Sequence, residues 1–246
     1  MKRYAIGLVI LLLAAIALAH WYYADRGRFT TTAEYEGLAR QVVGQALISK
    51  SDPPLTLRFD SRYRYLGGQK FVLYGVADTE QHFFVELDDQ GALLSVFWVQ
   101  YEAYLPEVDY SYNYDDSPLR LSLGGLEFFT DTAAFEFDPD KPRARGTDGA
   151  RVREFLALHG LSYPRQVTYA RAVHLPDETR RSELMIIFMD DLARYGLSAA
   201  AVNEGGAEHA RWAEIEAAHL QRLQSGIRVE PRVVVPAAAA PDGDSD

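Results

Sequence analysis

Residues 81–104, QHFFVELDDQGALLSVFWVQYEAY, contain two strand patterns separated by a turn. Both runs are rich in β-branched and aromatic residues, and Asp88 to Gly91 has the composition of a hairpin turn. Pairing Leu87 with either Ala92 or Leu94 assigns the side chains to the same two faces of the hairpin. One face is apolar until Gln100. It carries Phe83, Val85, Leu87, Leu94, Val96, Trp98, Gln100, Glu102 and Tyr104.

This apolar face is the side of the hairpin that we expect to pack on a core. The opposite face carries His82, Phe84, Glu86, Ser95, Phe97, Val99 and Tyr101. The second set is mixed, yet it is too aromatic for a face that only meets solvent. We therefore expect helices to cover part of the second face, or the face to line a groove.

Similar patterns continue on both sides of the hairpin. Strands are expected at 55–59, 62–65, 70–77, 119–123, 126–130, 166–175 and 182–190. Helices are expected at 32–49 after the capping box of Thr31 and Glu34, at 147–159 with Thr147 as N-cap, at 199–203 and at 207–224. The pattern predicts an α+β domain: a mostly antiparallel sheet of about six to eight strands packed by three or more helices.

The first 28 residues have the pattern of a leader that directs the chain to a membrane. Lys2 and Arg3 precede an uncharged run from Tyr4 to Tyr23, and about 20 such residues are enough to cross a bilayer. Trp21-Tyr22-Tyr23 fits an interfacial aromatic belt, which favours a permanent signal-anchor. Ala17-Leu18-Ala19 fits a signal-peptidase site, so cleavage after Ala19 is the alternative.

Both interpretations of the leader export the rest of the chain. We expect residues 29–230 to form one extracytoplasmic domain, and 231–246, rich in proline, alanine and aspartate, to be disordered. The absence of cysteine excludes disulfides, thiolate metal sites and a lipid anchor made on cysteine. The expected location is the bacterial inner membrane, single-pass with the C-terminal domain outside the cytoplasm, or the periplasm or exterior after cleavage.

The negative charge is concentrated in one part of the chain. The formal net charge is −10, and between Phe71 and Asp140 a single basic residue, Arg120, accompanies 15 carboxylates. A field of that sign repels phosphate backbones, so nucleic-acid binding is not expected. The partners expected instead are the membrane, through the N-terminal helix, and an envelope protein, peptide or glycan that is neutral or cationic.

The candidate binding surface is an aromatic and acidic stretch from Trp98 to Asp116. Tyrosines alternate with polar residues over 109–115, which predicts an edge strand with a tyrosine face. Tyrosine offers flat apolar area together with a hydrogen-bonding tip, as sugar- and peptide-binding surfaces do. The candidate ligand-binding residues are Trp98, Tyr101, Glu102, Tyr104, Tyr110, Tyr112 and Tyr114.

Catalysis has a weaker basis in the sequence. If the protein is an enzyme, Glu86 and Glu102 are the candidate carboxylates of a glycan or ester hydrolase, provided that they converge at a distance of about 6–10 Å. No histidine spacing fits zinc, and the polar residues from Asp109 to Asp115 lack the glycine and the glutamate that a calcium loop needs, so neither a metal nor a cofactor is expected.

The sequence therefore predicts a membrane-anchored, non-catalytic binding or accessory domain. The alternatives are a carboxylate-dependent envelope hydrolase and a structural envelope protein that acts by oligomerisation. Arginines in the C-terminal half, including Arg180 and Arg181, complement the acidic first half, so head-to-tail association of two copies is one further expectation.

Overall fold

The computed structural model describes residues 13–16, 26–138, 141 and 144–232. Most of the expected leader and nearly all of the expected tail lie outside these residues. Residues 13–16 form one helical turn, and Leu13 and Ile16 are exposed on it. Among the described residues, no helix has the length and apolar content that crossing a membrane requires.

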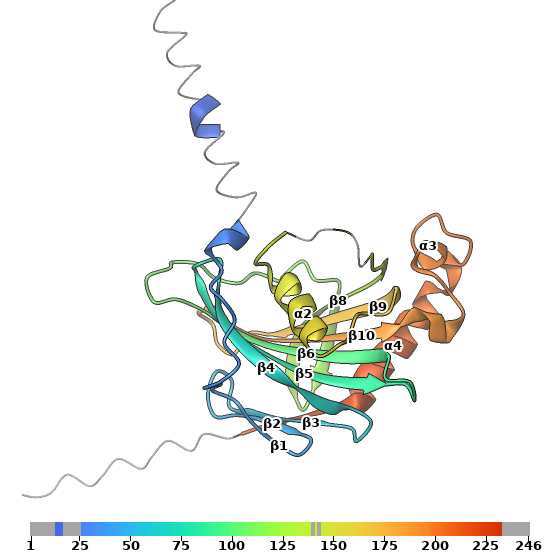
Figure 1. The fold of residues 1–246 in the computed structure, drawn as a ribbon, viewed down its shortest axis with the longest axis horizontal. Coiled ribbons are helices and arrows are strands. Elements are labelled where there is room, and N and C mark those ends of the chain that lie inside the picture. Colours follow the sequence, from blue (N-terminus) through green and yellow to red (C-terminus); the bar gives the residue numbers. More distant parts are fainter. Residues whose placement is uncertain (1–12, 17–25, 139–140, 142–143, 233–246) are drawn as a thin grey trace, which may run out of the picture.

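Seven antiparallel strands form the larger sheet, and the hairpin of residues 81–104 lies near its centre (Figure 1). The order is β4-β5-β6-β10-β9-β8-β7. The bounds are β4 Arg64–Leu73, β5 Ala77–Leu87, β6 Leu93–Tyr104, β7 Leu119–Leu123, β8 Leu126–Glu136, β9 Gln166–His174 and β10 Ser182–Asp191. The expected antiparallel sheet is thus confirmed.

A second, four-stranded antiparallel sheet lies against one face of the first, in the order β1-β2-β3-β11. Its strands are β1 Gln41–Val43, β2 Ala46–Ser49, β3 Leu55–Phe59 and β11 Ile227–Pro231. The fold is therefore a two-sheet, β-rich structure with few helices, rather than one sheet covered mainly by helices.

The register of the central hairpin explains how the two faces are used. Phe83 pairs with Trp98 and Val85 with Val96, and a bulge beside Glu86 then pairs Leu87 with Leu93. Since neighbours across the strands share a face, this register groups Phe83, Val85, Val96 and Trp98 as expected. On the opposite face, Phe84, Phe97 and Val99 are fully buried in the core between the two sheets.

Helices cover the other face of the large sheet and one of its ends. Helix α2, Asp148–Leu158, begins at the N-cap Thr147 and places Phe155 against Phe83, with 4.5 Å between the ring centroids. After β10, the 3-10 turn η2 Leu192–Tyr195 precedes helix α3, Ala199–Val202. The 3-10 turn η3 His209–Arg211 then leads directly into helix α4, Trp212–Gly226. A first 3-10 turn, η1, spans Arg26–Phe29.

The expected helix at 32–49 is wrong, because this segment forms the β1–β2 hairpin and an edge contact with β4. Gly44 adopts a φ of 59° in the turn, and the hairpin buries Leu47 in the core between the sheets. Thr31 does not cap a helix: its Oγ1 accepts a hydrogen bond from the backbone N–H of Val72 at 2.9 Å. Glu34 bridges to Lys70 on the same edge strand.

The second sheet is closed by a strand that the sequence pattern did not indicate. After α4 the chain enters β11, whose Val229 packs in the core between the sheets. Gly124, in the turn between β7 and β8, lies so close that an added Cβ would be 2.0 Å from the Val229 carbonyl oxygen. The large sheet therefore curls until its outer hairpin touches the edge of the small one. Pro231, expected in the tail, ends β11.

Candidate functional site

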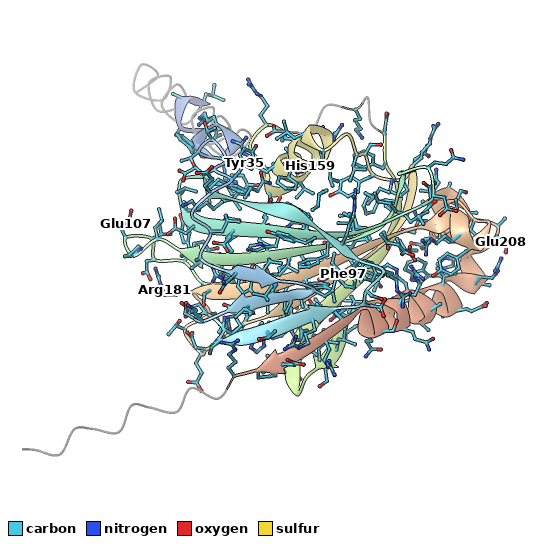
Figure 2. All side chains as sticks on the ribbon, turned by 60° about the horizontal axis from the view of Figure 1, so that its bottom comes forward. Tyr35, Phe97, Glu107, His159, Arg181 and Glu208 are labelled. Carbon is cyan, nitrogen blue, oxygen red and sulfur yellow. The ribbon has the colours of Figure 1, made fainter. Side chains whose placement is uncertain are left out.

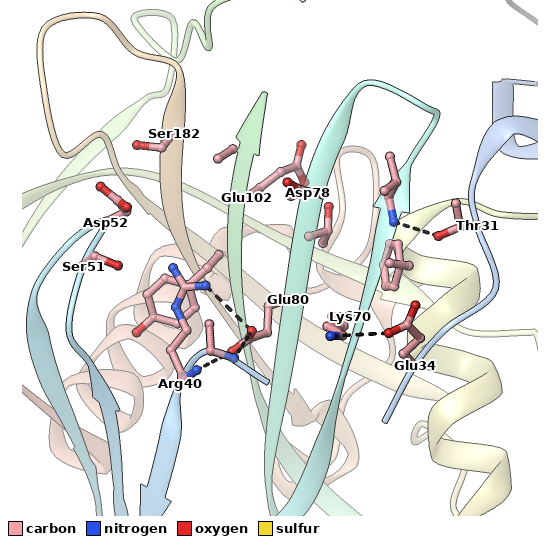
Figure 3. Close-up of a pocket in the computed structure, with 16 residues that line it drawn as sticks. Thr31, Glu34, Arg40, Ser51, Asp52, Lys70, Asp78, Glu80, Glu102 and Ser182 are labelled. Carbon is pink, nitrogen blue, oxygen red and sulfur yellow. Dashed lines mark hydrogen bonds and ion pairs between the residues drawn. The ribbon is translucent and has the colours of Figure 1, made fainter. Parts of the chain in front are cut away.

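A cleft of about 480 Å³ opens where the β2–β3 connection meets one end of the large sheet (Figure 3). We call it the edge cleft. The end of β4, the start of β5, the end of β6 and the start of β10 all contribute to it, because antiparallel neighbours bring alternate termini to one edge. It is lined by Thr31, Glu34, Ala39, Arg40, Ser51, Asp52, Lys70, Phe71, Val72, Asp78, Thr79, Glu80, Tyr101, Glu102, Ala103 and Ser182.

Both basic side chains of the edge cleft are already paired with carboxylates (Figure 3). Lys70 Nζ lies 3.4 Å from Glu34 Oε2, and Arg40 Nη1 lies 3.8 Å from Glu80 Oε2. Glu80 is buried and accepts hydrogen bonds from the backbone N–H groups of Ala39 and Arg40 at 2.7 and 2.9 Å. Burial opposes ionisation of Glu80, but bonds from His82 and these amides lower its pKa below the usual range.

Three further carboxylates of the edge cleft, those of Asp52, Asp78 and Glu102, have no ion-pair partner among the described residues. Asp52 and Asp78 are exposed, whereas Glu102 is partly buried. The cleft therefore keeps an excess of negative charge after its internal pairs are formed. Such a site attracts neutral polar or cationic groups and repels anions.

Trp98 and Tyr101, both candidate binding residues, are buried on opposite faces of β6. Trp98 is 5% exposed and packs in the core beneath α2, where it borders a separate cavity of about 210 Å³. Tyr101 is 2% exposed, and the guanidinium of Arg40 lies 4.0 Å from its ring centroid. Only Tyr101 reaches the edge cleft. The two rings do not form a shared binding surface.

The other candidate tyrosines lie on β6 and on the connection after it. We call residues 105–118 the tyrosine segment. No strand forms there, so the expected edge strand is wrong. Tyr112 is 8% exposed and stacks on Tyr104 with 4.4 Å between centroids, while Tyr110 is 58% exposed. Glu107 of the segment and Arg181 of the β9–β10 connection occupy the same end of the molecule, opposite Glu208 (Figure 2).

The tyrosine segment is fastened to the neighbouring β9–β10 connection. The backbone N–H of Tyr112 donates to the carbonyl of Arg180 at 2.8 Å, and the Arg180 guanidinium pairs with Asp115 at 3.0 Å. Arg181 donates to the carbonyl of Leu105 at 2.9 Å. The two arginines that we expected to serve association between copies are thus engaged within the chain.

Glu102 on β6 and Glu183 on β10 are direct cross-strand neighbours, a relationship that the sequence pattern does not predict. Glu183 is 1% exposed. Tyr112 Oη donates to Glu102 Oε1 at 2.8 Å, and Tyr114 Oη donates to Glu183 Oε2 at 2.7 Å. Burial first, and then nearby negative charge, raise the pKa of Glu102 to about 7 and that of Glu183 to about 8.

A row of buried glutamine side chains ends at Glu102. Gln69 Nε2 donates to Gln81 Oε1, Gln81 Nε2 to Gln100 Oε1, and Gln100 Nε2 to Glu102 Oε2, each at 2.7 Å. All three amides are at most 1% exposed. Every donor therefore points toward Glu102, and both oxygens of this carboxylate accept a hydrogen bond, which favours its ionised form.

Glu86, the other candidate catalytic carboxylate, is far from Glu102 and on the opposite face. It pairs with Ser95, seven residues along β6 from Glu102, and a strand rises about 3.3 Å per residue. Burial of Glu86 is outweighed by the Ser95 hydroxyl and by Arg194 and Arg222, so its pKa is lowered. The structure does not bring Glu86 and Glu102 together as a hydrolytic pair.

Two features of the sequence bear on the site residues that it did not predict, Glu183 and the contact between Arg40 and Glu80. Glu183 immediately precedes the apolar run of β10, where an isolated carboxylate is unusual, but its neighbour depends on the pairing of β10 with β6, which one sequence does not specify. Arg40 and Glu80 meet through the β1–β2 hairpin, and the expected helix at 32–49 concealed that contact.

No metal site emerges within the described part of the chain, since no group of three or more histidine, aspartate or glutamate side chains there is arranged to hold an ion. The candidate site is thus the edge cleft with the neighbouring Glu102–Glu183 pair. No protein-family model, curated protein or solved structure matches this chain.

Proposed function

We propose that this protein is a non-catalytic binding domain whose ligand site is the edge cleft. The proposal rests on one observation: Arg40 and Lys70 are neutralised by Glu80 and Glu34, whereas Asp52, Asp78 and Glu102 keep uncompensated charge around an open volume of about 480 Å³. A concave site with convergent polar groups is suited to small ligands or to a peptide segment. The ligand we infer is a neutral polar or cationic molecule of the cell envelope, either a peptide or a glycan.

The setting of this function is also a proposal. We infer that the N-terminal segment tethers an extracytoplasmic β-rich domain to the bacterial inner membrane, with release by cleavage after Ala19 as the alternative. The unbroken apolar run from Tyr4 to Ala19 supports this location. N-terminal sequencing of the mature chain distinguishes the two: a chain that starts at Met1 supports the tether, and one that starts at His20 supports cleavage.

Chemical-shift mapping tests the edge cleft directly. The full-length chain, isotopically labelled and held in detergent micelles, is titrated with the tripeptide Ala-Lys-Ala and with an N-acetylglucosamine trisaccharide. Binding in the cleft shifts the amide signals of Asp52, Asp78 and Ser182 and leaves those of the distant β5–β6 turn unchanged. If neither probe shifts any signal of the cleft, the proposal fails.

A matched pair of variants assigns the binding to the cleft charge. Asp78→Asn removes one unpaired carboxylate from the cleft, whereas Asp89→Asn removes one from the exposed β5–β6 turn. Both variants make the net charge less negative by the same amount. We expect Asp78→Asn to weaken the binding of Ala-Lys-Ala several-fold and Asp89→Asn to leave it unchanged. Equal weakening by both would mean that only the overall charge of the chain attracts the peptide.

A carboxylate-dependent hydrolase is the second candidate, favoured by the raised pKa of Glu102 beside the cleft. A carboxyl group that titrates near neutral pH is suited to act as a general acid. The buried Glu183, covered by Tyr114, is not positioned to touch a substrate in the cleft. Turnover of glycoside or ester substrates that is abolished by Glu102→Gln and retained by Glu86→Gln would replace the binding proposal with this one.

A further inference from the structure

We propose that Glu102 and Glu183 hold a single proton between them and act as a pH-sensitive latch, which keeps the tyrosine segment on the sheet when protonated and releases it when the second carboxyl ionises. Glu102 also lines the edge cleft, but the inference does not depend on which ligand the cleft binds. It concerns residues 105–118, which cover the pair and carry both of its tyrosine donors.

The first step is the position of the two carboxyl groups. Direct cross-strand partners on one face of an antiparallel sheet have Cβ atoms about 4.5–5.5 Å apart, and like charges at such positions repel each other. Glu183 is 1% exposed, and neither Glu102 nor Glu183 has a basic ion-pair partner among the described residues. Two buried negative charges at this spacing are strongly disfavoured, so one proton is retained between them.

The hydrogen bonds indicate which group holds the proton. Glu102 accepts from Gln100 on Oε2 and from Tyr112 on Oε1, so both of its oxygens act as acceptors. Glu183 accepts from Tyr114 on Oε2. The closed state that satisfies these bonds has Glu102 ionised and Glu183 protonated. Burial also raises the pKa of Tyr112 and Tyr114, which keeps both hydroxyls available as donors.

The surrounding charges do little to stabilise a second negative charge on the Glu102–Glu183 pair. Arg171 of β9 is the nearby cation, but its guanidinium is bonded to Asp131 of β8 at 2.6 Å and lies over the Tyr114 ring. Asp148, at the start of α2, adds negative potential at both carboxyls. The titratable and charged groups that interact with the pair are Tyr74 from the β4–β5 turn, Tyr104 from β6, Tyr112 and Tyr114 from the tyrosine segment, Arg171 from β9 with its partner Asp131 from β8, and Asp148 from α2.

The response to the second ionisation is expected to be local. Unfolding a domain costs about 5–15 kcal/mol, whereas moving a surface connection costs less. The tyrosine segment has no strand pairing of its own. It is held by the hydroxyl bonds of Tyr112 and Tyr114, the Asp115–Arg180 ion pair, the bonds that join Tyr112 and Leu105 to the β9–β10 connection, and a backbone bond from Leu105 to Val76. Its release admits water to both carboxylates and ends the desolvation that opposes their charge. High pH therefore opens the latch, and low pH closes it.

Hydrogen exchange of the full-length chain in detergent micelles tests the latch. The probe is the backbone N–H of Tyr112, which donates to the Arg180 carbonyl in the closed state. After correction for the intrinsic pH dependence of exchange, we expect its exchange rate to rise about tenfold between pH 7 and pH 9, since the opening releases one proton. An unchanged corrected rate would overturn the proposal.

Two variants separate the latch from general effects of pH. Glu183→Gln keeps an acceptor for Tyr114 but removes the second ionisation, so the corrected rate should stay low throughout this range. Glu107→Gln, an exposed carboxylate of the same segment, should keep the tenfold rise. If Glu183→Gln does not fold, Glu102→Gln provides the same test. A rise that persists in the folded Glu183 or Glu102 variant refutes the shared proton.

Discussion

The ring of Phe59 on β3 stacks on the ring of Phe84 on β5, with 3.7 Å between the centroids. This contact joins the two sheets across the core, and both rings are buried. It also accounts for the aromatic character of the second hairpin face, which meets another sheet rather than solvent. The stability of the domain therefore depends on contacts between the small sheet and the large one.

Replacing this ring tests that dependence. Phe59→Ala removes a buried aromatic side chain and leaves a cavity between the sheets, so the free energy of unfolding should fall by about 3–5 kcal/mol. Denaturant titration followed by circular dichroism measures it. Leu158→Ala, at a side chain that is 67% exposed, should change it by less than about 1 kcal/mol. Similar losses in the two variants would contradict the arrangement.

The turn between β7 and β8 provides a matched pair of glycines. Gly124 and Gly125 both have positive φ, 59° and 82°, so alanine is strained at either position. Only at Gly124 would the new Cβ meet the Val229 carbonyl, whereas nothing lies within 4 Å of it at Gly125. Gly124→Ala should destabilise the fold by at least about 2 kcal/mol more than Gly125→Ala, as thermal unfolding of both variants would show.

Arg222 is predicted to be essential for fixing α4 to the large sheet. Its Nε lies 2.6 Å from Oδ2 of Asp190, which is fully buried, and its Nη2 lies 3.2 Å from Glu86. Arg222→Met leaves both acids with less compensation and should lower the unfolding free energy by about 3 kcal/mol. Arg228→Met, at a pair that is largely exposed, serves as the control and should cost less than about 1 kcal/mol. Equal losses of unfolding free energy in the two variants would contradict the predicted role of Arg222.

The buried His219 is expected to make the fold less stable at acid pH. Burial lowers its pKa to about 3, so the folded chain keeps the ring neutral, while the unfolded chain protonates it below its usual value of 6.5. The contribution of the neutral ring to the free energy of unfolding is therefore complete above pH 6.5 and is lost as the pH falls toward 3. Between pH 6 and 4 the loss is about 1.4 kcal/mol per unit.

Comparing the pH dependence of two histidine variants checks this assignment. His219→Gln should remove that slope from the denaturant titrations, because the group that takes up a proton on unfolding is absent. His174→Gln, at a histidine that is only partly buried, should keep it. A slope that survives in His219→Gln would assign the loss of stability at acid pH to other groups.

The sequence pattern was sufficient for the large sheet and insufficient for the small one. Alternation along β5 and β6 gave the correct faces for Phe83, Val85, Val96 and Trp98, because a buried face requires one parity. Next to the turn it failed, since the bulge beside Glu86 pairs Leu87 with Leu93 rather than with Ala92 or Leu94. Residues 35–46 place apolar side chains at helical spacing by coincidence, and the turn at Gly44 with the β-branched Val42 and Val43 prevailed. Propensity is weak there compared with the gain from burying Leu47 between the sheets.

The candidate site was predicted only in part, for a different reason. Tyr112 and Tyr114 are predicted to bind a ligand, yet their hydroxyls donate to Glu102 and Glu183 within the chain. A tyrosine beside acidic residues has the same pattern in both cases. Which carboxyl each hydroxyl meets depends on the pairing of β6 with β10, and this is a long-range property of the fold.

The row of glutamines has a fixed direction with a consequence of its own. Gln81 and Gln100 each accept from one neighbour through the amide oxygen and donate to the next through the nitrogen. The row begins at Gln69, whose Nε2 donates both to Gln81 and, at 3.1 Å, to the carbonyl of Arg151. One glutamine cannot turn over without placing two donors or two acceptors face to face. Reversing all three together is excluded as well, because it would set Gln100 Oε1 against Glu102 Oε2 and Gln69 Oε1 against the Arg151 carbonyl. A carboxylate at one end and a backbone carbonyl at the other therefore hold an interior that spans three strands in a single orientation.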